Sequence, residues 1–275
     1  MDFYNGKKVY ITGGSSGIGL AAAKLVARAG GHVSISARGE ERLQAALAEI
    51  KAAAVRPDQR FGYVAHDVSD AAQCEAAVPQ VLAQLGGLDV VIANAGVAHP
   101  GRILETPAEV FEKMMRINYF GTVHTTRAFL PQLYAQKRGH IGIVSSLLGF
   151  MGIYGYTAYA ASKFAQVGFA EALRQELIDY NVKLSILYPP DTDTPQFAAE
   201  NEIKPGETKA ISGEVKVMSA EDVATALLLG IARGKYHIVP GAMSKFTRFM
   251  HRHAPWVVKM VVDGELKKYR KTHPV

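Results

Sequence analysis

Short apolar runs alternate with longer segments of helical character along most of this chain. Runs of the length of a buried strand occupy residues 9–11, 32–37, 60–65, 88–93, 140–144 and 182–188. The helical segments between them lie at residues 17–29, 39–54, 71–85, 107–117 and 157–180, and a further helical stretch runs from Asn118 to about residue 136. Because strands that alternate with helices pair in parallel, this pattern predicts an α/β fold with a doubly wound parallel sheet.

The length and composition of the chain favour one domain. With 275 residues, of which 48% are hydrophobic and 20% charged, the chain can bury one large core. No repeat, low-complexity segment or linker divides the sequence, so we expect a single domain over residues 1–275. Residues 242–275 are expected to form a basic amphipathic C-terminal extension of that domain.

Cysteine content and charge exclude several classes of protein. Cys74 is the single cysteine, which rules out an intramolecular disulfide and a cysteine-rich zinc site, so we predict no metal centre and a reducing compartment. The formal net charge of +6 suits anionic ligands or surfaces without implying a nucleic acid. Because no apolar run is long enough for a signal peptide or a bilayer crossing, we expect a cytoplasmic protein.

A glycine-rich turn follows the first predicted strand. Residues 12–19 read Thr-Gly-Gly-Ser-Ser-Gly-Ile-Gly and lead directly into an alanine-rich helix. In this setting glycines permit a tight turn and a close backbone approach, while the free amides and the dipole of the helix attract a pyrophosphate. The turn therefore indicates a Rossmann-type dinucleotide site, although a glycine-rich turn without a ligand has the same local sequence.

Arg38 stands where the second predicted strand ends, and Arg42 follows one helical turn later. In a dinucleotide fold this strand end meets the adenosine ribose, where an acid binds the 2′-hydroxyl of NAD and an arginine accommodates the 2′-phosphate of NADP. No acid precedes Arg38, so the sequence predicts NADP(H) as the cofactor. The alternative is that both arginines are merely solvated on the following helix.

Tyr159 and Lys163 are four residues apart on a predicted helix, which places their Cβ atoms about 5–6 Å apart on one face. A lysine ammonium about 5 Å from a phenol, at an effective dielectric constant of about 20, favours the phenolate by roughly 3 kcal/mol, or about two pKa units. The pair can therefore act as an acid or a base, with Ser145 or Ser146 at the preceding strand end binding a carbonyl oxygen. The Tyr–Lys pair at residues 4 and 8 has the same spacing, so spacing alone does not identify a site.

These segments together resemble the short-chain dehydrogenase/reductase superfamily over roughly residues 6–240. The match consists of several motifs in order, namely Thr12-Gly13-Gly14-Ser15-Ser16-Gly17-Ile18-Gly19, Asp67-Val68, Asn94-Ala95-Gly96, Asn118, Ser146, Tyr159 and Lys163. Their joint occurrence is far more specific than any single motif. The resemblance also favours Ser146 over Ser145 and removes the pair at residues 4 and 8 from consideration.

The resemblance implies a catalytic role for four of the matched residues. Tyr159 would protonate the carbonyl oxygen during reduction, and Lys163 would lower the pKa of Tyr159 and bind the nicotinamide ribose. Ser146 would orient the carbonyl, and Asn118 would help to hold a proton-relay water. A purely structural alternative for Asn118 is that it caps a break between two helices.

Contacts with the rest of the cofactor are also implied by the resemblance. They are expected at Gly13, Ser15, Ser16, Gly17 and Ile18 for the phosphates, at Asp67 and Val68 for the adenine, and at Asn94 and Gly96 along the cofactor. The alternative for Asn94 is a turn closed by its own side chain.

Residues 188–208 carry a narrower resemblance, to the 3-ketodihydrosphingosine reductases. The shared residues include Tyr188-Pro189-Pro190-Asp191-Thr192-Asp193-Thr194-Pro195, Phe197, Glu200-Asn201, Lys204-Pro205 and Glu207-Thr208. This resemblance implies NADPH-dependent reduction of 3-ketodihydrosphingosine to dihydrosphingosine in sphingolipid synthesis, with this segment as a lid over the nicotinamide. The alternatives are a rigid, proline-stiffened surface loop, a reductase of another lipid-like ketone (a steroid or a 3-oxoacyl thioester), and a non-catalytic NADP-binding sensor.

The C-terminal extension has apolar residues at helical spacing, including Phe246, Phe249 and Met250, and a second apolar stretch that begins at Trp256. Such a segment can lie peripherally in a bilayer interface, pack on its own core or pack on a second subunit. Eukaryotic members of the narrower family carry additional membrane segments that this chain lacks, so it resembles a shorter form. The broader family implies a homodimer or homotetramer that assembles through residues 111–136 and 157–180.

Overall fold

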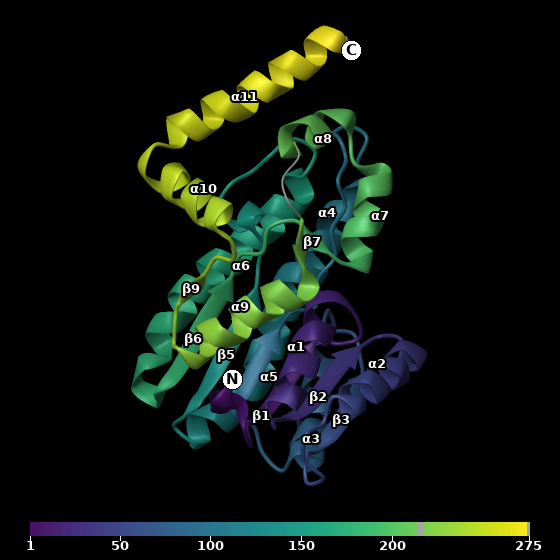
Figure 1. Ribbon diagram of the computed structural model, residues 1–275, viewed down its shortest axis with the longest axis vertical. Coiled ribbons are helices and arrows are strands. Elements are labelled where there is room, and N and C mark those ends of the chain that lie inside the picture. The colour runs from purple at the N-terminus through teal and green to yellow at the C-terminus, as the bar shows by residue number, and fades with distance from the viewer. Residues whose placement is uncertain (214–216, 274–275) are drawn as a thin grey trace.

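Seven parallel strands form the central sheet in the computed structural model, which describes residues 1–213 and 217–273 (Figure 1). Their order across the sheet is β3-β2-β1-β4-β5-β6-β9, and every neighbouring pair is parallel. The strands are β1 (Lys8–Thr12), β2 (His32–Ala37), β3 (Phe61–Ala65), β4 (Val90–Ala93), β5 (Gly139–Val144), β6 (Val182–Leu187) and β9 (His237–Ile238). The predicted doubly wound sheet is therefore confirmed.

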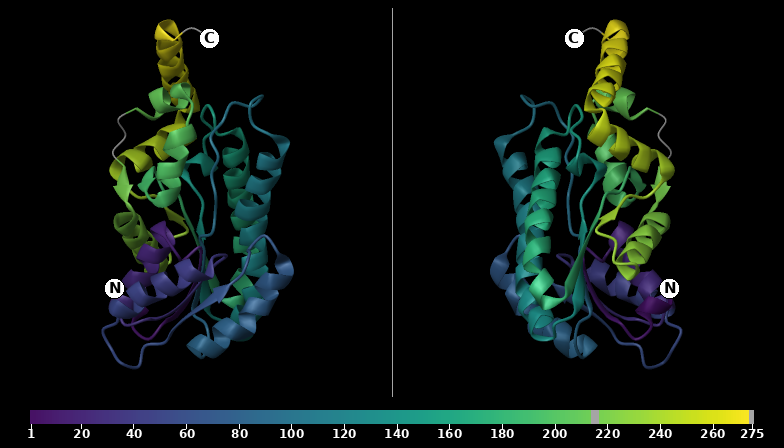
Figure 2. Two further views of the ribbon diagram at one scale, coloured as in Figure 1. Left: turned by 90° about the vertical axis from the view of Figure 1, so that its right-hand side faces the viewer. Right: turned by 90° about the vertical axis from the view of Figure 1, so that its left-hand side faces the viewer.

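Helices cover both faces of the sheet, which Figure 2 shows edge-on between two helical layers. One layer contains α1 (Gly17–Arg28), α2 (Glu40–Ala52) and α9 (Ala220–Ala232). The other contains α3 (Ala71–Leu85), α5 (Gly121–Ala135) and α6 (Thr157–Glu176). Each layer packs on the sheet through its own hydrophobic cluster, because the strands are buried on both faces.

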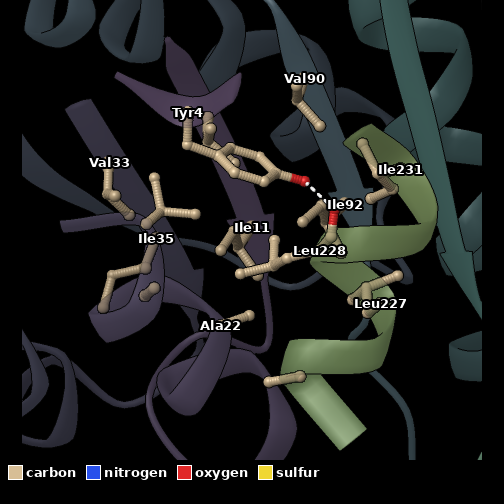
Figure 3. Packing of buried hydrophobic residues seen from close by; sticks show 14 of the residues in the cluster. Tyr4, Ile11, Ala22, Val33, Ile35, Val90, Ile92, Leu227, Leu228 and Ile231 are labelled. Carbon is tan, nitrogen blue, oxygen red and sulfur yellow. Dashed lines mark hydrogen bonds between the residues drawn. The ribbon is translucent and has the colours of Figure 1, made fainter. Parts of the chain in front are cut away.

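Tyr4 lies in the core beneath α9 rather than in any site. It belongs to a short 3-10 helix, η1 (Asp2–Tyr4), and its buried ring packs among side chains of the sheet and of α9 (Figure 3). Its hydroxyl donates a hydrogen bond of 2.8 Å to the backbone oxygen of Leu228. The amino group of Lys8 instead donates to the carbonyl of Gly86. The Tyr–Lys pair at residues 4 and 8 is thus part of the scaffold.

The helical region before β5 is one continuous path rather than two separate helices. α4 (Ala108–Met114) passes into a π-helical turn, η2 (Met115–Phe120), and then into α5. Asn118 lies within this turn and caps no helix end, so the structural alternative for this residue is wrong.

Earlier in the chain, Asp70 caps α3 by accepting hydrogen bonds from the amides of Ala72 and Gln73.

The segment after β6 folds into small elements that hydrophobic periodicity does not predict. They are β7 (Thr192–Asp193), α7 (Pro195–Ile203), α8 (Gly206–Ser212) and β8 (Met218–Ser219), with β7 and β8 paired in parallel. The prolines occupy helix starts: Pro195 is the first residue of α7 and Pro205 is the cap residue of α8. The segment is therefore helical, not the stiffened loop considered as an alternative.

Two helices form the C-terminal extension, α10 (Ala242–His253) and α11 (Pro255–Thr272). α11 packs against α8 and α10 and stands away from the sheet at the top of Figure 1. The last two residues of the predicted extension, 274–275, lie outside the described residues. Within residues 1–213 and 217–273, no helix combines the length and apolar character that a bilayer crossing requires.

Candidate active site

A cavity of about 1190 Å³ opens at the carboxyl ends of the strands. It lies where the chain reverses its direction of progress across the sheet, between β1 and β4, which is where open α/β sheets bind ligands. Its wall begins at Arg38 and Arg42, passes the glycine-rich turn and the Tyr159 side chain, and reaches the C-terminal helices at Met243 and Val262. Nearly all the predicted site residues line this cavity; the one exception is Asn118.

The glycine-rich turn is shaped so that only glycine fits at key positions. Gly13 and Gly17 have φ angles of +66° and +54°, in the left-handed region that side chains disfavour. A Cβ on Gly13 would lie 2.9 Å from the Asn94 side-chain nitrogen, and one on Gly19 would overlap the Gly13 carbonyl. Asn94 holds the turn by donating to the carbonyls of Thr12 (3.0 Å) and Gly13 (3.2 Å). Its side chain therefore does not close the turn considered as an alternative.

The start of α1 offers unpaired donors to this part of the cavity. Ser16 is the cap residue of α1, and its hydroxyl makes no capping hydrogen bond. The amides of the first helical turn have no partner within the helix, and the dipole of the helix favours an anion at this end. Ser15, Ser16, Gly17 and Ile18 all line the cavity. The glycines of the turn leave room for a ligand, and the free amides at the start of α1 can donate hydrogen bonds to it. Together with the cavity volume, these features fit the pyrophosphate of a dinucleotide.

Arg38 and Arg42 stand at one end of the cavity, where β2 passes into α2. Both side chains are exposed, and neither forms an ion pair within residues 1–213 and 217–273. Gly39 lies between them without a side chain, and a Cβ there would be 3.5 Å from the Nε atom of Arg42. Two uncompensated guanidinium groups at this position can receive a phosphate.

Tyr159 and Lys163 meet on one face of α6, beside the end of β5. The amino group of Lys163 lies 5.5 Å from the centre of the Tyr159 ring and donates to the Val144 carbonyl at 3.1 Å. Lys163 is only 4% exposed. The Ser145 hydroxyl donates to the Lys163 carbonyl at 3.2 Å and so is tied to the helix backbone, whereas the Ser146 hydroxyl lies close enough to Tyr159 to lower its pKa.

Burial dominates the electrostatics of this pair. It raises the pKa of Tyr159 above its ordinary value of about 10, and the Glu200 carboxylate raises it further. Burial lowers the pKa of Lys163 to about 7, against the opposing effect of Glu200. The sequence argument assumed a fully charged lysine and left out the desolvation of both groups. The expected lowering of the Tyr159 pKa by Lys163 is therefore outweighed among the described residues.

Asn118 lies behind the cavity wall rather than in it. Its side chain is fully buried, donates to the Val97 carbonyl and the Ser162 hydroxyl at 2.9 Å each, and accepts from the Val97 amide at 2.8 Å. Asn118 and Lys163 both lie next to Gly96. A Cβ on Gly96 would lie 3.2 Å from Asn118 Oδ1 and 3.6 Å from Lys163 Nζ. Asn118 is thus placed to hold the segment along which a cofactor would lie.

Asp67 and Val68 line the cavity after β3, as expected for a base-binding edge. One carboxylate oxygen of Asp67 accepts from the Ser69 amide at 2.9 Å and from its hydroxyl at 2.8 Å. These bonds fix the turn, and the second carboxylate oxygen makes no hydrogen bond with the described residues. Asp67 therefore retains an acceptor for a ligand.

The lid segment contributes charged groups to which the sequence analysis assigned no role. Glu200 of α7 accepts a hydrogen bond of 2.8 Å from the Tyr156 hydroxyl, and the Tyr156 ring lies 5.7 Å from that of Tyr159. Lys204 is buried, with its amino group 4.7 Å from the centre of the Phe197 ring. Glu200 and Lys204 lie far from Tyr159 in the sequence, so no local spacing could have indicated the contacts.

A second cluster anchors the far end of the lid. Buried Glu207 of α8 accepts from Arg102 at 3.0 and 3.2 Å and from the Tyr154 hydroxyl at 3.1 Å. Thr208 donates to the Tyr154 carbonyl at 3.0 Å. The residues shared with the narrower family at 200–208 thus hold the lid against the loop that precedes α6.

Comparisons with known proteins agree with this geometry. A family model described as short chain dehydrogenase matches residues 7–205. A 3-dehydrosphinganine reductase of Danio rerio is 40% identical over 233 residues, which cover 84% of this chain and 70% of that protein. A 3-ketodihydrosphingosine reductase of Bos taurus is 39% identical over 233 residues, with the same coverage of 84% and 70%.

Solved structures with the same fold are similar over nearly the whole chain. A short chain dehydrogenase/reductase from Burkholderia phymatum, in complex with NAD, matches with a TM-score of 0.80 and 25% identity, over 94% of this chain and 96% of that one. Levodione reductase matches with a TM-score of 0.79 and 25% identity, over 88% and 98% of the two chains. In the first of these, the bound molecule is a nicotinamide dinucleotide.

Proposed function

This chain belongs to the short chain dehydrogenase family, and on that premise we propose that it reduces the ketone of 3-ketodihydrosphingosine to dihydrosphingosine. One observation carries the proposal: a single cavity joins the Tyr159 and Lys163 side chains to an apolar wall. That wall contains Leu148, Met151, Ile153, Ile211, Val217, Met243 and Val262. A long alkyl chain gains about 0.8 kcal/mol for each buried CH₂ group, so such a wall suits a long-chain ketone.

We assign the proton donor as Tyr159. The substrate carbonyl oxygen would accept hydrogen bonds from the hydroxyls of Tyr159 and Ser146, and the Tyr159 proton would pass to that oxygen. When bound, a reduced nicotinamide dinucleotide supplies the hydride for the carbonyl carbon. A protonated Lys163 would stabilise the phenolate that remains, and its pKa of about 7 allows both of its protonation states near neutral pH.

We further propose that the dinucleotide is NADP(H). Arg38 and Arg42 would bind the 2′-phosphate, because they lie at the end of β2 without carboxylate partners among the described residues. Gly13, Ser15, Ser16, Gly17 and Ile18 would hold the pyrophosphate, and Asp67, Val68, Asn94 and Gly96 would bind the remainder of the molecule.

The oxidation of NADPH by purified protein tests this function. We expect turnover with 3-ketodihydrosphingosine, and much slower turnover with a steroid ketone or a 3-oxoacyl thioester of similar size. Tyr159→Phe removes the donated proton but keeps the ring, so we expect kcat to fall by about 100-fold or more. Faster reduction of the steroid or the thioester would contradict the substrate, and Tyr159→Phe activity within a fewfold of wild type would contradict the proton donor.

We propose that the C-terminal extension contacts a membrane surface, where a long-chain ketone would partition. Phe246 and Phe249 of α10 are 59% and 58% exposed, and Trp256 of α11 is 68% exposed. Lys245 and Arg252 lie on the same helix as the exposed phenylalanines. Exposed aromatic residues flanked by cations are typical of helices that bind at a bilayer interface.

We also propose a homo-oligomer that assembles through α5 and α6. Phe120, the last residue of η2 before α5, and Phe164 of α6 are each 45% exposed, and η2 packs against α6. Exposed aromatic residues on adjacent helices are typical of interfaces between subunits. Sedimentation velocity measures the assembly directly, and a monomer at tens of micromolar protein would contradict it.

A further inference from the structure

Glu200 places a carboxylate inside the candidate active site, and the mechanism above gives it no role. It lies on α7, in the lid, and lines the same cavity as Tyr159, Lys163 and Ser146. One carboxylate oxygen accepts from the Tyr156 hydroxyl at 2.8 Å, and the other accepts from the Gln196 side-chain amide at 2.9 Å. These two bonds fix the direction of the group, and each oxygen retains a second lone pair.

No cation lies within ion-pair distance of Glu200 among residues 1–213 and 217–273. Lys163 is near enough for Glu200 to raise its pKa, and the Lys204 amino group lies against the rings of Phe197 and Tyr156. A fixed anion beside Tyr159 also raises the pKa of that residue and makes it a weaker acid. For a neutral ketone, this weakening of the Tyr159 acid opposes the favourable effect of Glu200 on the charge of Lys163.

The proposed substrate carries the missing cation. 3-Ketodihydrosphingosine has a primary amine, protonated at neutral pH, on the carbon next to its ketone. When the ketone oxygen meets Tyr159 and Ser146, this ammonium group must lie only a few ångströms from them. On the basis of the proposed function, we propose that Glu200 binds the substrate ammonium and selects 2-amino ketones over simple ketones.

Asp191 is the other carboxylate of this part of the cavity, and it is the weaker candidate. Burial raises the pKa of Asp191, which favours its neutral form. The opposing influence on that pKa comes from Lys204, so a lysine already faces this carboxylate. Glu200 is held by two neutral donors instead, and it forms no ion pair with any of the described residues.

The test compares two ketones and two variants. The ketones are 3-ketodihydrosphingosine and 1-hydroxyoctadecan-3-one, which differ by the amine alone. Glu200→Gln keeps the shape of the side chain and can still accept from Tyr156, whereas Glu202→Gln removes the same charge from an exposed position of the same helix. We expect Glu200→Gln to lower kcat/KM for the amino ketone roughly 10- to 100-fold more than for the other ketone, because any effect through the pKa of Tyr159 or Lys163 acts on both ketones. Glu202→Gln should change neither value.

A binding measurement separates recognition from catalysis. In isothermal titration calorimetry, Glu200→Gln should weaken the binding of dihydrosphingosine, the amine-bearing product, by a similar factor and leave that of octadecane-1,3-diol unchanged. An equal loss for both ketones would mean that Glu200 acts through Lys163 or Tyr159, and would overturn the inference. An amine-selective loss in Asp191→Asn alone would overturn it as well.

The wild-type protein distinguishes failure of this inference from failure of the proposed function. If it reduces both ketones equally well, the reductase activity stands and selection of the amine by Glu200 is wrong. If it reduces neither ketone, the proposed function itself is wrong, and the inference about Glu200 fails with it.

Discussion

Lys163 is a lysine that folding removes almost entirely from water. Among the described residues its amino group makes one hydrogen bond, to the Val144 carbonyl, and burial brings its pKa down from about 10.5 to about 7. A charged amine in this position is costly, and a neutral one is a poor partner for a phenolate. Stability therefore favours a neutral Lys163, whereas the proposed chemistry favours a charged one. The pH dependence of the free energy of unfolding measures the cost of burying the charge.

We predict that the stability of the wild-type protein rises with pH between about 7 and 9. In this window the unfolded chain holds the Lys163 proton and the folded chain has largely lost it, so unfolding takes up a proton. Lys163→Met keeps the apolar stem and should remove this part of the slope, with a gain of up to about 4 kcal/mol at pH 7 and below. Urea unfolding at several pH values, without nucleotide, measures both effects, and parallel pH profiles for the two proteins would contradict the prediction.

Arg38 is expected to discriminate between the two nicotinamide dinucleotides. Arg38→Ala removes a charge-assisted contact with the 2′-phosphate, worth about 1.5–3 kcal/mol, so the KM for NADPH should rise by roughly 10- to 100-fold. The KM for NADH should stay within a fewfold, because NADH lacks that phosphate. Lys51→Ala, a loss of positive charge at the other end of α2, is the matched control. Equal losses for NADPH and NADH would count against the contact.

The sequence predicts a site residue well when its contacts lie within one helix or turn, and poorly when its partners are distant in the sequence. Tyr159 and Lys163 share one helix, and the glycines of residues 12–19 belong to one turn, so spacing was informative for both. Glu200 meets Tyr156 only after the chain has crossed β6, and Asn118 meets Val97 through a π-helical turn. Burial also depends on the whole fold, which is why the shifted pKa values of Tyr159 and Lys163 could not be foreseen.

At the level of elements, α7 and α8 belong to the segment that the sequence predicts to be a lid, and buried Glu207 helps to fix the far end of that segment. Glu207 is 3% exposed and binds Arg102 and Tyr154 together, so it joins α8 to the loop before α4 and to the loop before α6. At the near end, Thr194 lies against the glycine-rich turn, where a Cβ on Gly17 would approach it to 3.0 Å. The lid is thus held at both ends.

We predict that Arg102→Ala loosens the lid without disturbing the sheet. Glu207 would keep its Tyr154 hydrogen bond but lose its charged partner. The KM for the ketone should rise severalfold while the KM for NADPH changes little, and limited proteolysis should cut near residues 203–206 faster. Arg116→Ala, which removes an exposed ion pair with Glu112, is the control. Unchanged cleavage and KM in Arg102→Ala would show that the ion pair does not hold the lid.

Hydrophobic periodicity predicts the large elements of this protein better than its small ones. A strand such as β4 (VVIA) is apolar throughout because both faces are covered, and its run stands out in the sequence. β7, β8 and β9 have two residues each, too few for any period to show. The prolines at 195 and 205 begin helices here, and a proline at a helix start has the same local sequence as one in a stiff loop.

For the whole molecule, the C-terminal extension is the feature that most affects contacts with other surfaces. Phe246 and Phe249 point away from the core, since both remain more than half exposed, so packing of these side chains on the chain's own core is not what the extension does. A membrane surface and a second subunit remain as partners for them, and vesicle binding separates the two.

We predict that the protein floats with vesicles that contain anionic lipid, and that a double variant, Phe246→Ser with Phe249→Ser, does not. Burying each phenylalanine in the interface contributes roughly 2 kcal/mol, so their joint loss should reduce binding by more than 100-fold. Val55→Ser, a change at a similarly exposed apolar residue just after α2, should float like the wild type. A wild-type protein that never floats would rule out the membrane contact.

The contact between α11 and α8 ties the extension to the lid. Gly206 has no room for a side chain because the Tyr269 hydroxyl occupies that space, and Arg270 lies 5.7 Å from the centre of the Tyr154 ring, next to the anchor of α8. A shift of α11 must therefore carry α8 with it. Any surface that binds the C-terminal extension would therefore also act, through α11 and α8, on access to the candidate active site.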